Sequence, residues 1–290
     1  MTDVPTVDVH QHLLPPSLVQ ALRRRTAPPR IVGTEIEIAE GRFAFDPAEH
    51  DLATRVGLLD RLGTDVAALS LQPSLGHDRL EPAERMELVA AWENGIAELV
   101  AAAGGRLVAL APGSTSAGFA GSCVGSDALG DLDALAPVVA SVRECGGFLF
   151  VHPSGGPVPS GAPGWWGGIA LYTAQMQVAY LSWLVHGQER WPDVPVVFAI
   201  LAGGGPFQLE RLASRGVDVR STLHRNIFFD TASYGRRALE LCVETFGVEQ
   251  LVYGSDLPVV DPVPTLRAIE GFGESVERML RQDTPARLLP

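Results

Sequence analysis

Short apolar runs alternate with helix-like segments along the whole sequence, and this alternation constrains the fold more than any other feature. Eight runs rich in Val, Leu, Ile or Phe are expected to be strands, at residues 6–12, 66–71, 107–111, 121–124, 148–152, 196–201, 227–230 and 251–254. Most of them lack polar alternation, which is typical of parallel strands buried on both faces. Helical patterns fill most gaps. The sequence therefore predicts an α/β protein, a (β/α)8 TIM barrel that forms one domain over residues 1–290.

Two connections depart from regular alternation. Residues 31–45 alternate apolar and polar positions around Glu40-Gly41 and predict a small β-hairpin excursion after strand 1. Residues 112–120 are too few and too rich in Gly and Ser for a full helix, so we expect a shortened connection between strands 3 and 4. An open doubly wound sheet is the alternative fold, but it usually has a glycine-rich phosphate loop after its first strand.

The helix that follows the excursion has clear boundaries in the sequence. Asp46 is a suitable N-cap, Pro47 suits the first helical position, and Gly63 can end the helix. Leu52, Val56, Leu59 and Leu62 form its apolar stripe. We therefore expect one continuous helix between Asp46 and Gly63.

The composition excludes several classes of protein. A formal net charge of −12 argues against nucleic-acid binding, and no apolar run is long enough to span a bilayer. The first residues lack the basic region and apolar core of a signal peptide, and the 3 cysteines fit no disulfide framework, so we expect a cytoplasmic protein. The sequence contains no lysine, which excludes Schiff-base chemistry and a metal pair bridged by a carbamylated lysine.

Histidines and an aspartate follow three of the predicted strands. His10 and His12 are two positions apart at the end of the first strand and therefore point to the same side. His152 ends the strand 148–152, and Asp256 follows the strand 251–254. Because all strand C-termini of a parallel barrel meet at one mouth, these four side chains are expected to converge there. Imidazole and carboxylate groups in such an arrangement predict a divalent metal site.

These motifs also carry a family resemblance over nearly the whole chain. Val-Asp-Val-His-Gln-His at 7–12, Phe-Val-His-Pro at 150–153 and Gly-Ser-Asp-Leu-Pro at 254–258 resemble the amidohydrolase superfamily, in the branch related to aminocarboxymuconate-semialdehyde decarboxylase. The resemblance implies that His10, His12, His152 and Asp256 bind one divalent metal ion, most often Zn²⁺, with Mn²⁺ as the alternative. It also implies a water molecule in the open position.

The sequence departs from this family at one position. The family usually has a histidine before the glycines that follow the next strand, where this chain has Ala202 before Gly203-Gly204-Gly205. In the decarboxylases that histidine is an acid/base, and such a group is worth about 10²–10⁴-fold in rate. The candidates to replace it are Asp256 and His77, which follows the second strand. We expect His186 on the outer ring, and His50 and His224 on the surface.

Four residues are candidates for binding the substrate. Arg42 lies in the hairpin excursion, where related decarboxylases hold a carboxylate with an arginine. Trp165 and Trp166 lie in the long loop after His152, where aromatic side chains could cover a flat or apolar substrate. Tyr234 follows the strand 227–230 and would face the same mouth.

Three functions are consistent with these residues. The first is a metal-dependent hydrolase that acts on a small organic molecule, with metal-activated water and Asp256 as general base and acid. The second is a nonoxidative decarboxylase or other lyase of the same branch, or a pathway-specific variant with altered chemistry, and Ala202 weakens this reading. The third is a metal-binding scaffold that has lost catalysis. Related barrels are often homodimers, which is a further expectation, although the sequence identifies no interface.

Overall fold

Eight parallel strands form the centre of the protein in the computed structural model, which describes residues 4–115, 117–219 and 226–290. The neighbouring strands are hydrogen-bonded in the order of the chain, β1-β5-β6-β7-β8-β9-β10-β11. Their bounds are β1 Val7–His12, β5 Val66–Ser70, β6 Leu107–Pro112, β7 Gly121–Gly125, β8 Phe148–His152, β9 Val196–Phe198, β10 Ile227–Asp230 and β11 Leu251–Val252. Each strand pairs in parallel with the next, so the predicted barrel architecture is confirmed.

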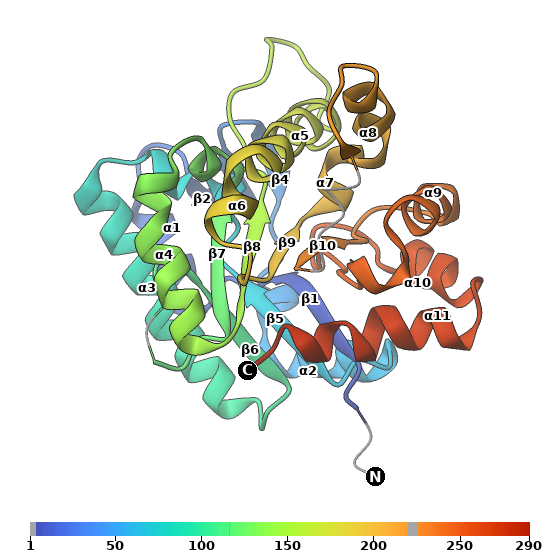
Figure 1. Cartoon of the computed structure of the whole chain (residues 1–290). Coiled ribbons are helices and arrows are strands. Elements are labelled where there is room, and N and C mark those ends of the chain that lie inside the picture. The colour runs from blue at the N-terminus through green and yellow to red at the C-terminus, as the bar shows by residue number, and fades with distance from the viewer. Residues whose placement is uncertain (1–3, 116, 220–225) are drawn as a thin grey trace.

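Backbone hydrogen bonds between β1 and the chain that continues from β11 bring the first and last strands together. Val9 N donates to Tyr253 O at 3.0 Å, and Asp256 N donates to His10 O at 2.8 Å. Figure 1 accordingly shows the blue N-terminal strand beside the red C-terminal part of the chain. The eight-stranded sheet therefore curves into a nearly closed barrel.

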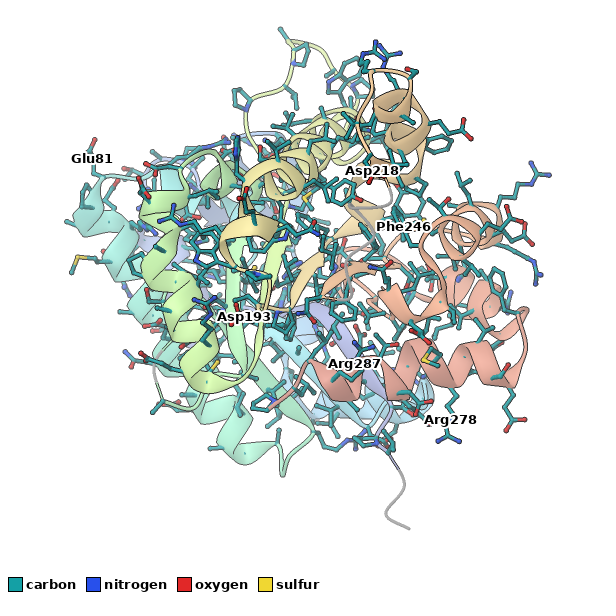
Figure 2. The ribbon with its side chains drawn as sticks, viewed as in Figure 1. Glu81, Asp193, Asp218, Phe246, Arg278 and Arg287 are labelled. Atoms are coloured by element: carbon teal, nitrogen blue, oxygen red, sulfur yellow. The ribbon has the colours of Figure 1, made fainter. Side chains whose placement is uncertain are left out.

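Helices surround the strands on the outside (Figure 1). The α-helices are α1 Pro16–Arg24, α2 Leu52–Arg61, α3 Pro82–Ala102, α4 Leu132–Cys145, α5 Tyr172–Ser182, α6 Gln188–Arg190, α7 Ile200–Gly204, α8 Pro206–Ala213, α9 Arg236–Phe246, α10 Val263–Glu270 and α11 Glu274–Arg278. Charged side chains such as Glu81 and Arg278 point away from this layer (Figure 2). Among the described helices, none is both long and apolar enough to cross a membrane.

Shorter helical turns complete the connections. The 3-10 turns are η1 Pro47–His50, η2 Pro73–Leu75, η3 His77–Arg79, η4 Ser126–Gly130, η8 Val248–Gln250 and η10 Pro285–Arg287. The π-helical turns are η5 Gly167–Leu171, η6 Trp183–Gly187 and η9 Met279–Asp283. The connection from β6 to β7 contains no helix in its described residues, which confirms the predicted shortened connection.

The excursion after β1 is larger than the predicted hairpin. It consists of three antiparallel strands, β2 Arg30–Val32, β3 Glu35–Ile38 and β4 Gly41–Ala44. The helix expected between Asp46 and Gly63 is also divided, because Asp46 caps only the turn η1. Asp51 then accepts a hydrogen bond from Thr54 N and begins α2. The break between η1 and α2 places His50 at the end of a turn rather than on a helix surface.

The predicted strand 196–201 ends early, at Phe198, because the backbone changes direction after it. Ile200, Leu201 and Ala202 have φ of 47°, 51° and 52°, in the left-handed region, and the two following glycines continue the turn. A left-handed conformation costs about 1–2 kcal/mol for each non-glycine residue. The segment labelled α7 is therefore a strained left-handed turn rather than an ordinary helix.

Two glycines inside helices differ in the space around them. A Cβ atom on Gly95 of α3 would lie 2.2 Å from Ser17 Oγ and 2.6 Å from Pro15 Cβ, in the contact with α1. A Cβ atom on Gly57 of α2 would meet only the end of the Arg61 side chain, at 3.7 Å. Gly95 is therefore required for helix packing, and Gly57 is not.

We expect the substitution Gly95→Ala to lower the free energy of unfolding by about 1–3 kcal/mol, because the added methyl group overpacks the contact between α1 and α3. The matched substitution Gly57→Ala should raise it by up to about 1 kcal/mol, because alanine is the better helix former. Urea denaturation followed by circular dichroism measures both changes. Equal effects of the two substitutions would contradict this account of the packing.

Candidate metal centre

The structure brings the four predicted metal ligands together at the C-terminal end of the barrel. His10 and His12 belong to β1, His152 ends β8, and Asp256 follows β11. Their candidate ligand atoms all lie within 4.8 Å of one another. His10 Nε2 is 3.1 Å from His12 Nε2, and Asp256 Oδ1 is 3.4 Å and 3.2 Å from these two nitrogens.

The outer nitrogen of each histidine is held by another group. His10 Nδ1 contacts Asp230 Oδ2 at 2.7 Å. His12 Nδ1 lies 3.1 Å from Ser70 O, and His152 Nδ1 lies 3.0 Å from Pro153 O. These carbonyl and carboxylate acceptors require a proton on Nδ1, so Nε2 is the nitrogen of each ring that could bind a cation at the centre.

The electrostatics of the cluster differ between its three histidines. Burial lowers the pKa of His12 and of His152, which keeps both rings neutral. Burial also acts on His10, but the Asp230 and Asp256 carboxylates outweigh it and raise the pKa of His10 to about 9. The pKa of Asp256 is lowered despite its burial, because His10 and His12 favour the ionised carboxylate.

This donor set fits a single divalent cation. A tetrahedral ion with nitrogen and oxygen ligands at about 2.0–2.2 Å separates neighbouring ligand atoms by about 3.4 Å. The closest separations in the cluster, 3.1–3.4 Å, are of this size. Hydrogen bonds on the far side of ligating imidazoles are also typical of metal sites. His10, His12, His152 and Asp256 could therefore hold one metal ion.

A buried polar network anchors the strand that carries two of these ligands. Asp8 Oδ1 accepts hydrogen bonds from His10 N at 3.1 Å and Ser255 N at 3.0 Å, and Asp8 Oδ2 accepts one from Gln11 Nε2 at 2.7 Å. Arg55 Nη1 donates to Gln11 Oε1 at 2.7 Å, and Arg55 Nη2 donates to His12 O at 3.1 Å. The network fixes β1 against α2 and the end of the barrel.

Asp256 reaches the cluster through an unusual backbone conformation. Its φ is 59°, in a region that non-glycine residues seldom occupy. The conformation is held by the bond from Asp256 N to His10 O and by Ser255 Oγ, which accepts from Leu257 N at 3.2 Å. Such strain persists only where the surroundings fix it, and here it turns the carboxylate toward the histidines.

The cluster opens into a cavity of about 260 Å³. Ile36, Ile38, Phe43 and Phe45 of the excursion and its connection form an apolar wall. No arginine lines the cavity in the described part of the chain, and the whole sequence has no lysine. The polar groups that line the cavity besides the ligand cluster are Asp46, Glu49, His50, Gln72, Ser74 and Tyr172.

His77 and Arg42 do not line this cavity. His77 is 2% exposed and its Nε2 lies 3.6 Å from Asp78 Oδ1. Arg42 is exposed and lies near the carboxylates of Glu35 and Glu37. Side chains alternate between the faces of a strand, so β4 directs Phe43 to the cavity and Arg42 away from it.

The aromatic candidates also lie elsewhere. The rings of Trp165 and Trp166 contact each other, with centroids 5.9 Å apart, and Trp165 is 60% exposed. Tyr234 packs against the core, and its carbonyl accepts a hydrogen bond from Thr265. None of these three side chains is among the residues that line the cavity. The tyrosine that reaches the cavity is Tyr172, at the start of α5.

The sequence interpretation missed two residues of the site. His50, expected on the surface, is buried and lines the cavity. Asp230 is the last residue of β10 and contacts His10, and its position at the C-terminal end of a barrel strand is the signal that could have identified it. His186 is exposed, as expected, and His224 lies outside the described residues.

Ala202, in place of the family histidine, is completely buried in the core and does not line the cavity. The left-handed turn that contains it instead directs Ile200 to the cavity. Ile200 N donates to Asp230 Oδ1 at 3.2 Å, and the same oxygen accepts from Ala232 N at 2.8 Å. Asp230 therefore joins this turn to His10.

We expect Asp230→Ala to weaken binding of Zn²⁺ or Mn²⁺ by about 10–100-fold, because His10 loses the carboxylate that orients its ring. Asp133→Ala is the control, since Asp133 is an exposed aspartate paired with Arg190. Competition with a chromogenic chelator measures both affinities. Unchanged affinity in Asp230→Ala would remove Asp230 from the metal centre.

Comparison with known proteins agrees with this architecture. The IDCase of Metarhizium anisopliae in apo form has a TM-score of 0.81 and 17% identity, with 98% of this chain and 96% of that chain covered. The 5-carboxyvanillate decarboxylase of Sphingomonas paucimobilis has a TM-score of 0.77 and 19% identity, with 99% of each chain covered. The dihydroxybenzoic acid decarboxylase of Polaromonas sp. JS666, with bound manganese and the inhibitor 2-nitroresorcinol, has a TM-score of 0.70 and 14% identity, with 99% and 97% covered. The family model described as Amidohydrolase matches residues 7–290, and the chain belongs to this family.

Proposed function

We propose that this protein is a metal-dependent carboxy-lyase that removes CO2 from a small organic carboxylate without oxidation. The observation that carries the proposal is the position of the candidate ligand cluster at an otherwise largely apolar cavity that no arginine lines in the described residues. Asp46, Glu49 and Asp256 also make the cavity acidic. A bound cation would therefore be the positive charge that attracts a carboxylate.

The similar structures support this reaction over hydrolysis. Two of the three compared proteins are decarboxylases by their descriptions, and the one from Polaromonas contains manganese. Mn²⁺ is therefore a candidate for the cation beside Zn²⁺, since imidazole and carboxylate ligands suit both ions. A small molecule as the substrate agrees with a cavity of about 260 Å³.

The apolar wall of the cavity favours loss of CO2. Phe43 and Phe45, together with Ile200, line the cavity and would replace water around a bound carboxylate. A localised carboxylate loses more from desolvation than the charge that spreads over the body of the substrate as CO2 departs. The residues that surround the substrate therefore raise the energy of its ground state relative to the transition state.

The reaction also requires a proton for the substrate. Cleavage of the bond to the carboxyl group leaves an electron pair on the substrate carbon, and one proton must reach that carbon. When bound, the divalent cation would supply positive charge that stabilises the developing negative charge. Asp256 Oδ1 is engaged by His10 and His12, so Oδ2 is the atom at which the ionised Asp256 would take up a proton from water and pass it to carbon.

Hydrolysis is the second candidate, and one observation favours it. The pKa of Asp256 is lowered, so its carboxylate is ionised at neutral pH, which is the form that a general base needs. Asp256 would then take a proton from the attacking water and return it to the leaving group. This route also uses no group at position 202, where the chain has only a buried alanine.

A substrate screen in D2O distinguishes the two reactions. The manganese-loaded and zinc-loaded proteins are incubated with a panel of hydroxybenzoates and with a matched panel of their amides and esters. Decarboxylation releases CO2 and places deuterium on the carbon that carried it, whereas hydrolysis consumes water and forms a new acid. Release of CO2 supports the proposal, and turnover of amides or esters alone overturns it.

We expect Asp256→Asn to abolish turnover while part of the metal binding is retained, because the amide cannot carry the proton although the three histidines remain. Glu49→Gln is the matched control, since Glu49 is another carboxylate that lines the cavity. Steady-state rates and metal content are measured together. Unchanged turnover in Asp256→Asn would exclude Asp256 as the proton carrier.

A further inference from the structure

His50 is a buried histidine at the cavity that the proposed reaction does not use. It ends the turn η1, and its ring lines the same cavity as His12, His152 and Asp256. The ring stacks on Phe45, with centroids 5.3 Å apart and an interplanar angle of 18°. Its orientation is therefore fixed by contacts rather than left to solvent.

The hydrogen bonding of His50 defines its tautomer. Leu14 N donates to His50 Nδ1 at 3.1 Å. A backbone N–H can only donate, so Nδ1 must carry the lone pair, and the neutral ring must carry its proton on Nε2. Among the described residues, no hydrogen-bond partner of this Nε2 is found. The edge of the His50 ring that faces away from Leu14 therefore carries an N–H donor, at Nε2.

The surroundings of His50 also keep the ring uncharged. Burial and the nearby Arg55 guanidinium lower the pKa of His50 to about 4. A neutral N–H donor suits an uncharged oxygen such as a carbonyl, and it adds no positive charge for a second carboxylate. The cavity thus offers a cation site at one place and a neutral donor at another.

We propose that the His50 Nε2–H group donates a hydrogen bond to an uncharged acceptor oxygen of the substrate and thereby determines which carboxylates the site accepts. This inference rests on the proposed carboxylate site. The substrate class that fits is a small monocarboxylate with an apolar body and a carbonyl-type oxygen. A dicarboxylate would find no second cation among the described residues that line the cavity.

Two substitutions separate the donor from the structural role of the ring. In His50→Asn the amide oxygen can replace Nδ1 as the acceptor for Leu14 N, but the donor at Nε2 is lost. In His50→Gln the longer amide can place its N–H₂ near the position of Nε2, but the acceptor for Leu14 N is lost. Thermal unfolding and metal content are measured for both variants to compare their folding with that of the original protein.

The probes are the three acetylbenzoates and the three isopropenylbenzoates, which differ only by replacement of a carbonyl oxygen with a methylene group. Their binding to the manganese-loaded protein is measured by titration calorimetry. We expect at least one acetyl isomer to bind about three- to tenfold more tightly than its isopropenyl counterpart. His50→Gln should keep this preference and His50→Asn should lose it.

The outcomes distinguish this inference from the proposed function. If the benzoates bind only in the presence of manganese but no acetyl isomer is preferred, the role of His50 is overturned and the carboxylate site stands. A preference that persists in His50→Asn overturns it equally. If none of the six probes binds better with manganese than without it, the proposed carboxylate site fails, and the role of His50 fails with it.

Discussion

Hydrogen bonding between β1 and the chain that follows β11 is the constraint on which the rest of the site depends. His10 and His12 come from the start of the sequence and Asp256 from near its end, so no local structure could bring them together. The bond from Asp256 N to His10 O, at 2.8 Å, joins these two segments at the ligands themselves. The contact that closes the barrel therefore also brings together the ligands from the two ends of the chain.

This closure depends on buried polar groups that are satisfied by one another. Asp8 accepts from both segments, at His10 N and Ser255 N, and burial raises its pKa. Gln11 connects Asp8 to the buried guanidinium of Arg55. A buried charge without partners would cost several kcal/mol, so the network stabilises only the register of β1 that aligns the ligands. Apolar contacts in the core of the barrel discriminate less between registers than this polar network does.

The sequence was sufficient to predict the barrel and the convergence of the ligand cluster because both depend on strand order and strand ends. It was not sufficient to predict the cavity wall. Arg42 and Phe43 are neighbours, and only the orientation of β4 decides which one faces the cavity. His50 was missed because Asp46 and Asp51 are both good caps, and the sequence did not show that the helix is interrupted between them.

At the turn of residues 200–204, alanine at position 202 in place of the family histidine goes together with a different use of the backbone. Its backbone directs Ile200 to the cavity and buries Ala202, while Asp230 binds both the turn and His10. An imidazole at position 202 would have to enter the packed core or unwind the strained turn, and unwinding would release one oxygen of Asp230. Asp230 therefore links the backbone of this turn to the candidate metal centre, and in the proposed reaction the proton would come from a side chain that already faces the cavity.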